Sequence, residues 1–239
     1  MNVHQTHNRL FMMLGLFAFT VMMPLYARAE TIAGCEADTI LTLSQQQAKT
    51  PIETRLSESL TLGFRQQFAD VVSQAKQDLR RKAFWRWNRK MAVVLDLDET
   101  LMDNRAYFAR HKVYEPDRWH QWVLKAEASA IPETLDFVKW LDRKDFKIYF
   151  ISGRKEKERA ATLANLKAMG VSEVDGVYLK PDDYDKASAA NFKVAARKEI
   201  EAKGYDITVV MGDQCSDLRG GYGSGDELYK LPNAIYTIP

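Results

Sequence analysis

The sequence lacks several features that would place a protein in a simple class. Its 239 residues include only two cysteines and four histidines. Two cysteines cannot build a disulfide scaffold, and the histidines form neither a zinc-ligand spacing nor a catalytic triad. There is no G-x-x-x-x-G-K-[ST] motif and no internal repeat, which excludes a P-loop NTPase and a solenoid. What remains is a chain that is 46% hydrophobic, enough for one well-buried domain.

The chain also lacks a surplus of charge of either sign. It has 34 Lys and Arg against 32 Asp and Glu, a formal charge of +2. Removal of residues 1–29 would take away Arg9 and Arg28 and no acid, which leaves 32 basic against 32 acidic residues. A polymeric nucleic acid requires a basic surface, so such a partner is not expected.

The first 29 residues predict a secretory signal peptide. A weakly basic start with Arg9 precedes an uncharged apolar run over residues 10–25, and small residues follow at Ala27 and Ala29. The run has 16 residues and contains Pro24, whereas a spanning helix needs about 20. We therefore expect a periplasmic or secreted bacterial protein with no transmembrane segment in the mature chain. An uncleaved anchor is the alternative.

The two cysteines leave three outcomes open. "TIAGC", which ends at Cys35, has the Gly-Cys pair of a lipoprotein signal, although the apolar run ends well upstream at Leu25. In an exported protein Cys35 could instead form a disulfide with Cys215, or stay free. A lipid anchor at Cys35, and with it an outer-membrane lipoprotein, is the minor alternative.

Short apolar runs alternate with segments of helical periodicity. Helices are expected over residues 51–84, 131–145, 156–170 and 188–204, after a polar and loose lead-in within residues 30–54. Strands are expected over residues 92–98, 146–154, 176–180 and 207–213, and a last short strand over residues 233–239. This alternation predicts βαβ units, and therefore an α/β fold with a mainly parallel sheet.

Polar residues follow three of the expected strands. Asp96 and Asp98 end the first, Ser152 ends the second, and Asp213 with Asp217 ends the third. Because ligands of such folds bind at the carboxyl ends of the strands, these side chains should converge in one crevice. Three or four carboxylates there repel one another unless a hard cation is present, and oxygen ligands in this number suit Mg²⁺.

This combination has an obvious use in phosphoryl transfer. One Asp can attack phosphorus and form an aspartyl-phosphate, while the cation binds a phosphoryl oxygen. A second carboxyl two residues on points to the same side of an extended chain. It can protonate the leaving oxygen and later activate water. A calcium-binding EF-hand loop does not explain the stretch, because its sixth position requires Gly and Leu101 stands there.

Four motifs in order resemble one family. They are "DLDET" from Asp96, "FISGR" with Ser152, "NFKVAARKEI" with Lys193, and "GDQCSDL" with Asp213 and Asp217. Over about residues 55–239 the chain resembles subfamily IIIB acid phosphatases of the haloacid dehalogenase (HAD) superfamily. These include exported class C-like bacterial enzymes and plant acid phosphatases. The resemblance implies a HAD-like Rossmannoid three-layer fold with a small helical cap, here about residues 105–131.

The resemblance also implies roles for residues of the first two motifs. Asp96 matches the nucleophile and a Mg²⁺ ligand. Asp98 matches the general acid and base, and offers its backbone carbonyl to the metal. Ser152 matches the hydroxyl that binds the transferred phosphoryl group.

The last two motifs complete the implied site. Lys193 matches the cation beside nucleophile and phosphate, although Lys180 and Lys186 compete for that role. Asp213 matches a further metal ligand, and Asp217 a ligand or an acid that holds metal-bound water. The implied metal set is Asp96, Asp98, Asp213 and Asp217.

The cap insert is rich in aromatic residues. Tyr107, Trp119 and Trp122 are candidates to stack on a nucleoside or aryl group of a substrate, and core packing is the alternative. Asp103 and Asn104, just past the first motif, are expected to form a turn.

Taken together, the sequence predicts an exported, Mg²⁺-dependent acid phosphatase that hydrolyses small phosphomonoesters, with nucleotidase activity as one form of it. Two alternatives stay open. A phosphotransferase would pass the phosphoryl group to an alcohol instead of water. A non-catalytic storage or binding protein on the same fold would use none of this chemistry, and the presence of Asp96, Asp98 and Lys193 argues against it.

Overall fold

A computed structural model describes residues 32, 35–85, 89–222 and 228–238. The predicted signal peptide, residues 1–29, lies outside this range. Among the residues described, no helix has both the length and the apolar character needed to cross a membrane.

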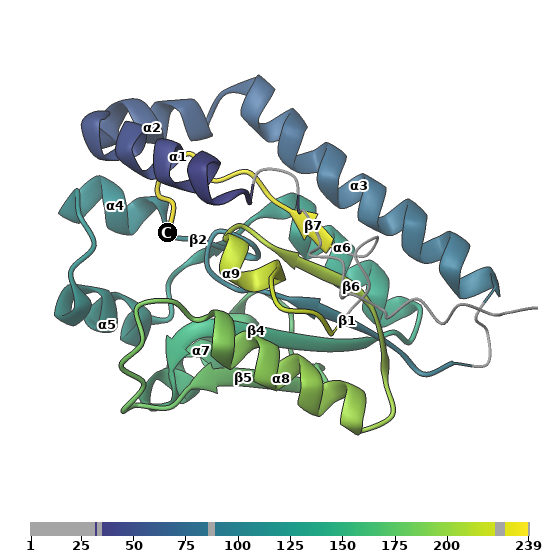
Figure 1. Cartoon of the computed structure of the whole chain (residues 1–239). Helices are drawn as coiled ribbons and strands as arrows, with labels where there is room; N and C mark the ends of the chain where they lie inside the picture. The colour runs from purple at the N-terminus through teal and green to yellow at the C-terminus, as the bar shows by residue number, and fades with distance from the viewer. Residues whose placement is uncertain (1–31, 33–34, 86–88, 223–227, 239) are drawn as a thin grey trace, which may run out of the picture. The chain divides into compact units, whose positions relative to one another are not determined.

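The centre of the domain is a five-stranded parallel sheet (Figure 1). Its order is β5-β4-β1-β6-β7. The strands are β1 (Met91–Leu95), β4 (Lys147–Lys155), β5 (Gly176–Lys180), β6 (Asp206–Gly212) and β7 (Leu228–Lys230). This confirms the predicted α/β class. Because β1 lies between β4 and β6, the motifs that contain Asp96, Ser152 and Asp213 lie on three neighbouring strands.

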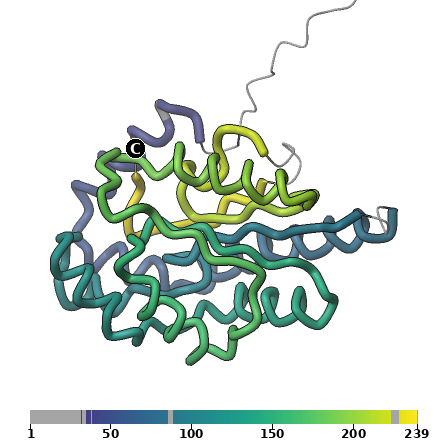
Figure 2. Tube along the Cα trace, turned by 90° about the horizontal axis from the view of Figure 1, so that it is seen from below, coloured from purple at the N-terminus to yellow at the C-terminus, as the bar shows by residue number. Residues whose placement is uncertain are grey.

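Helices cover both faces of the sheet and make three layers (Figures 1 and 2). Alternate residues of β1 point to opposite faces: Val93 and Leu95 join one buried cluster, Ala92 and Val94 another. The first cluster includes side chains of α3 (Leu62–Trp85), α6 (Pro132–Arg143) and α7 (Arg159–Ala168). The second includes side chains of α8 (Ala190–Ala202) and α9 (Cys215–Leu218).

The cap is inserted after β1 and closed at its base. β2 (Met102–Asp103) pairs antiparallel with β3 (Ser129–Ala130), which brings the two ends of the insert together. Between them lie α4 (Arg105–His111) and α5 (Pro116–Lys125), which correspond to the predicted helical cap. Tyr107 is fully buried between them, with its ring 5.1 Å from that of Trp119. A short 3₁₀ turn, η1 (Glu156–Glu158), contacts α5 through a 2.9 Å contact between His120 Nδ1 and Glu158 Oε1.

The N-terminal lead-in differs from the prediction. The sequence predicts a loose segment there, but α1 (Ala37–Lys49) and α2 (Ile52–Ser59) are both helical. The single helix expected over residues 51–84 is interrupted between α2 and α3. Most residues of α1 are polar and exposed, and its Ile40 is buried against Cys35 and Cys215. A tertiary contact therefore stabilises a helix in a segment whose polar composition predicted a loose lead-in.

The predicted last strand is also wrong. β7 comprises residues 228–230, and residues 233–238 are irregular. Side chains bind the backbone there in place of a neighbouring strand. Asn233 Oδ1 accepts from the N–H groups of Ile235 at 2.7 Å and Tyr236 at 3.2 Å, and Gln214 Oε1 accepts from that of Ile238 at 2.8 Å.

The two cysteines form a disulfide between Cys35 and Cys215, with their Cα atoms 5.5 Å apart. The bond joins the segment before α1 to the first residue of α9. Lipidation of Cys35 would need the same sulfur, so a lipid anchor and this disulfide exclude each other.

Candidate active site

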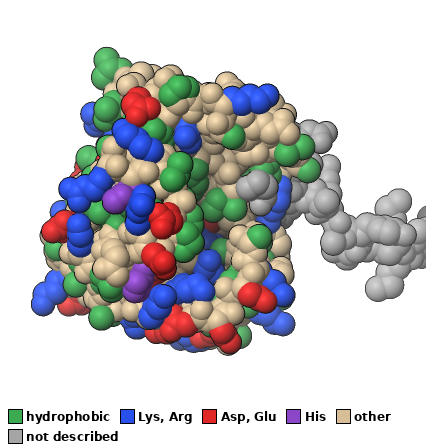
Figure 3. Space-filling model, turned by 90° about the vertical axis from the view of Figure 1, so that its left-hand side faces the viewer, with side chains coloured by type: hydrophobic (Ala, Val, Ile, Leu, Met, Phe, Trp, Pro, Cys, Tyr) green, Lys and Arg blue, Asp and Glu red, His purple; other side chains and the backbone are tan. Residues whose placement is uncertain are grey.

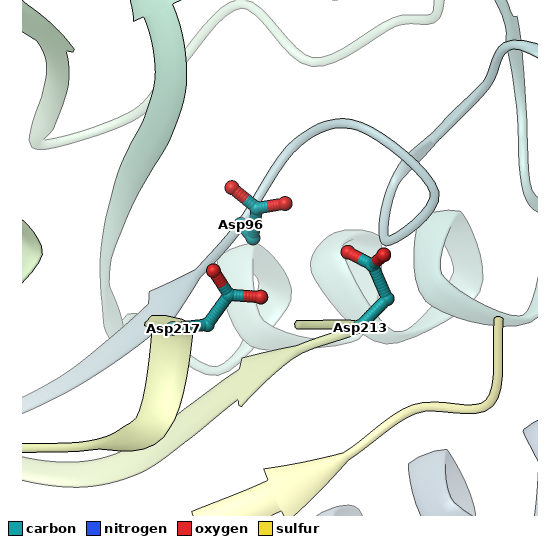
Figure 4. Close-up of side chains that lie close together, drawn as sticks. All are labelled: Asp96, Asp213 and Asp217. Carbon is teal, nitrogen blue, oxygen red and sulfur yellow. The ribbon is translucent and has the colours of Figure 1, made fainter. Parts of the chain in front are cut away.

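The residues predicted at the strand ends do converge. Asp96 directly follows β1 and Asp213 directly follows β6, while Asp217 lies in α9 immediately beyond (Figure 4). Ser152 lies within β4, which continues to Lys155 with irregular pairing to β5 between those two residues. Parallel pairing of β4, β1 and β6 aligns their carboxyl ends and so positions all four side chains.

Three buried carboxylates form a possible metal site. One oxygen each from Asp96, Asp213 and Asp217 lies within 4.8 Å of the others, and the three residues are at most 7% exposed. Figure 4 shows the three side chains grouped between the end of β1 and the β6–α9 turn. Burial raises the pKa of Asp96 well above its ordinary value, and raises that of Asp213 to about 6. A divalent cation that prefers oxygen ligands fits this donor set, because its charge would offset the repulsion of the acids.

Lys193 connects two of these acids. Its Nζ donates to Asp96 Oδ1 at 2.6 Å and to Asp217 Oδ1 at 2.7 Å, and the residue is 4% exposed. Burial by itself lowers the pKa of Lys193, but Asp217 and Asp96 raise it by more, so the net shift is upward. The ammonium therefore stays charged. Of the two competing lysines, Lys186 is exposed and pairs with Asp185. Lys180 lines a cavity together with Asp96, Asp213 and Asp217, but no hydrogen bond or ion pair is found between Lys180 and these acids among the described residues.

The carboxylate of Asp98 is turned toward a different partner. Arg154 donates from Nε to both oxygens of Asp98 at 3.1 and 3.0 Å, and from a terminal nitrogen to Oδ1 at 2.7 Å. Asn104 Nδ2 adds a bond of 3.0 Å to Oδ1. The side chain of Asp98 is therefore not part of the carboxylate cluster of Asp96, Asp213 and Asp217.

Arg154 is a residue that sequence reasoning missed. It is 2% exposed, and its second terminal nitrogen donates to Thr162 Oγ1 at 3.2 Å. A signal was available, because Arg154 stands two residues after Ser152 in "FISGR" and so points to the same side of β4. Ser152 Oγ accepts from the Arg154 N–H at 3.1 Å and lies 3.5 Å from Asp98 Oδ2.

Side chains from three segments hold Asp213. Gln214 Nε2 donates to its Oδ2 at 2.6 Å, and Asn233 Nδ2 donates to the same oxygen at 2.8 Å. Thr100 Oγ1 donates to Oδ1 at 3.3 Å. Asp217 is fixed in a similar way, since its Oδ2 accepts from the Gln214 N–H at 2.8 Å.

The turn after Asp98 has an unusual backbone. Glu99 has a φ of 56°, in the left-handed region, and its side chain is buried. One oxygen accepts from the Asn104 N–H at 3.1 Å and the other from the Tyr236 hydroxyl. Burial raises the pKa of Glu99 well above its ordinary value. The turn therefore depends on the contact between Glu99 and Tyr236 of the C-terminal segment. Asn104 was expected only to form a turn, but its side chain also binds Asp98.

A cavity of about 550 Å³ opens onto these residues. Asp96, Asp98, Lys193 and Arg154 are among the polar residues that line it. Four aromatic residues also line it: Phe108, Tyr114, Trp119 and Tyr236. Figure 3 views the side of the molecule that carries the cap, where hydrophobic, basic and acidic side chains are all exposed.

Only one of the three aromatic residues proposed to stack on a substrate lines this cavity. Trp119 does, whereas Tyr107 is fully buried. Trp122 donates from Nε1 to Asn104 Oδ1 at 2.8 Å and so supports the turn that holds Asp98. Phe108 and Tyr114 were not identified from the sequence, because helical spacing does not say which aromatic faces the cavity.

Plant and bacterial proteins are similar to this chain. The stem 28 kDa glycoprotein of Glycine max is 37% identical over 154 residues, 62% of this chain and 61% of that protein. Acid phosphatase 1 of Solanum lycopersicum is 30% identical over 149 residues, 61% of this chain and 58% of that protein. The matched region thus spans about three fifths of these plant relatives.

A solved structure shares the fold over most of the chain. The class C acid phosphatase of Bacillus anthracis superimposes with a TM-score of 0.65 at 26% identity, and the match covers 82% of this chain and 86% of that one. A family model described as HAD superfamily, subfamily IIIB (acid phosphatase), matches residues 26–239. The chain therefore belongs to subfamily IIIB, the acid phosphatases, of the HAD superfamily.

Proposed function

We propose that this protein is an exported, Mg²⁺-dependent acid phosphatase that hydrolyses small phosphomonoesters through an aspartyl-phosphate. The observation that carries the proposal is the contact of Lys193 with both Asp96 and Asp217 inside a buried carboxylate cluster, next to the Asp98–Arg154 pair. Nucleophile, cation and proton-transfer group then line one cavity.

In the first half-reaction a carboxylate oxygen of Asp96 attacks phosphorus, and the bond to the leaving oxygen breaks. Lys193 and the hydroxyl of Ser152 would hold the phosphoryl oxygens. Asp98 gives a proton to the leaving alcohol and later takes one from the water that cleaves the aspartyl-phosphate. Because Arg154 donates to both oxygens of Asp98, one of these bonds has to open before Asp98 reaches the leaving oxygen.

The side chains of Asp96, Asp213 and Asp217 and the backbone carbonyl of Asp98 would hold the metal. When bound, Mg²⁺ offsets the negative charge of the acids and of the transferred phosphoryl group. Without it, the negative acids and a phosphate dianion would repel each other in a buried site.

The aromatic residues that line the cavity suggest the kind of leaving group. Phe108, Tyr114, Trp119 and Tyr236 present flat apolar surfaces beside the phosphoryl site. A nucleoside or aryl group could stack there, so nucleoside monophosphates and aryl phosphates are the proposed substrates.

Two other functions use the same fold. A phosphotransferase would differ only in the acceptor, and an added alcohol would then yield a new phosphate ester. A storage role has precedent in the names of plant relatives, such as vegetative storage protein 1 of Arabidopsis thaliana, 31% identical over 151 residues. The retained Asp96, Asp98 and Lys193 favour catalysis here.

The test is an activity panel over nucleoside, sugar and aryl phosphates, with Mg²⁺ and with EDTA. Wild-type protein should release phosphate only with the metal, and Asp96→Asn should lower turnover at least about a thousandfold. Beryllofluoride should add to the wild type at Asp96 and not to the variant. Activity of more than a few per cent in Asp96→Asn would refute the assignment of the nucleophile.

Export has its own test. Expression of the whole chain in a secreting bacterium should yield a periplasmic or secreted protein whose sequence begins at Glu30. A blocked N-terminus at Cys35, with lipid attached, would contradict both this cleavage and the disulfide.

A further inference from the structure

The end of α3 exposes two large aromatic side chains. The residues of α3 that face the core are Phe68, Val72, Ala75 and Leu79, a 4-3-4 spacing that defines one face of the helix. Continued for another turn, this spacing reaches positions 82 and 83. Phe84 and Trp85 lie off that face and are 74% and 79% exposed. The phase of the helix, set by its buried face, therefore directs both rings into solvent.

Basic residues surround the two aromatics. Residues 76–85 and 89–90 contain six Lys or Arg and one acid, Asp78. The six are Lys76, Arg80, Arg81, Lys82, Arg89 and Lys90. Asp78 pairs with Arg81, and Asp206 pairs with Arg89. Residues 30–239 contain equal numbers of basic and acidic residues, so the excess of positive charge is a local feature of this end of α3.

Lys76 and Arg80 share one aromatic neighbour on the body of the domain. Its Nζ lies 5.1 Å from the centre of the Trp140 ring, and the guanidinium of Arg80 lies 5.3 Å from the same ring. Burial, together with the charges of Arg80 and Arg143, lowers the pKa of Lys76. An anion near this end of α3 would relieve the repulsion.

This surface is remote from the candidate active site. β1 begins at Met91, just after the end of α3, whereas Asp96 follows its last residue. The aromatic pair thus lies at the amino ends of the strands and the cavity at their carboxyl ends. In Figures 1 and 2 the last turns of α3 extend beyond the neighbouring elements of the domain.

We propose that this surface, the α3 tip (Arg80, Arg81, Phe84, Trp85 and Lys90), docks on a bilayer that contains anionic phospholipid. Aromatic rings partition into the interfacial region of a bilayer, and Lys and Arg bind its anionic headgroups. The rings of Phe84 and Trp85 meet edge to face, 5.1 Å apart, on a projecting helix end. A bilayer surface accepts such a projection, and docking there leaves the catalytic cavity facing the solvent.

The experiment measures binding of residues 30–239, since residues 31–239 form one compact unit. The probes are vesicles of phosphatidylcholine and vesicles in which one third is replaced by phosphatidylglycerol. Wild-type protein should bind the anionic vesicles at low salt, and high salt should weaken that binding. Phe84→Ser with Trp85→Ser should weaken it at least about tenfold. Arg80→Gln with Arg81→Gln should weaken it about thirtyfold, at about 1 kcal/mol for each charge.

Matched controls come from elsewhere on the same chain. Leu60→Ser with Leu62→Ser removes two exposed apolar side chains, 62% and 85% exposed, near the start of α3. Lys167→Gln with Lys198→Gln removes two exposed charges from α7 and α8. All four double variants should keep wild-type phosphatase activity, which shows that they fold. The proposal is overturned if the wild type does not bind anionic vesicles or if the tip variants bind them as well as the wild type does. It is also overturned if the control variants lose as much binding as the tip variants.

Discussion

Opening the disulfide should destabilise the domain substantially. Cys35 and Cys215 are 180 residues apart, so the bond closes a very long loop in the unfolded chain. The chain-entropy relation gives about 5 kcal/mol for a loop of this length, and native disulfides that are removed commonly cost about 2–5 kcal/mol. We expect a loss of free energy of unfolding within that range when the bond is reduced.

The same change should weaken metal binding. Cys215 lies between Asp213 and Asp217 in the chain. A second connection runs from α1, where Gln47 Nε2 donates to the backbone carbonyl of Asn233 at 3.1 Å, and Asn233 in turn donates to Asp213. Release of α1 removes both supports of the cluster. Loss of groups that orient metal ligands typically weakens affinity by about tenfold or more, and we expect about tenfold here.

The assay is urea unfolding with and without dithiothreitol, with Mg²⁺ titrated by calorimetry on the same samples. The double variant Cys35→Ala, Cys215→Ala is the control, because reductant should leave it unchanged. A thiol count must show that reduction is complete. A loss below about 1 kcal/mol in fully reduced protein would refute the stability estimate. Unchanged Mg²⁺ affinity, with reduced stability, would refute the link to the metal site.

Four further variants test the site. Asp98→Asn should slow esters with poor leaving groups by about a hundredfold or more, and aryl phosphates should show a burst followed by a slow steady state; equal losses in single turnovers without a burst would contradict its role as proton donor. Arg154→Met should lower kcat for the same poor leaving groups about a hundredfold and change the pH profile, with little change in KM; an unchanged profile would mean that Arg154 only packs. Lys193→Met leaves Asp96 and Asp217 buried without their cation, so metal-free protein should lose about 3–5 kcal/mol of stability in urea and Mg²⁺ should recover part of it. Trp119→Ala should raise KM for nucleoside monophosphates about tenfold and leave small alkyl phosphates unchanged, and a uniform effect would show that the ring does not contact the leaving group.

The sequence by itself determined the class of fold and the position of the acids. Strands buried on both faces need continuous apolar runs, and such runs mark β1 and β6 without any knowledge of their partners. Asp96 and Asp213 come directly after those runs, and parallel pairing then places both at the same edge of the sheet. The residue type and the position of each Asp at the end of a strand are local properties of the chain.

Only the tertiary structure decided which partners complete the site. Arg154 binds Asp98 and Asn233 binds Asp213 across large separations in sequence, and no periodicity reports such pairs. For the same reason the sequence did not show that α1 is helical, because its burial depends on Cys215. Periodicity records which face of an element is apolar. The pairing of polar groups, and the choice of Trp119 over Tyr107 as the residue lining the cavity, depends on how elements far apart in the chain are brought together.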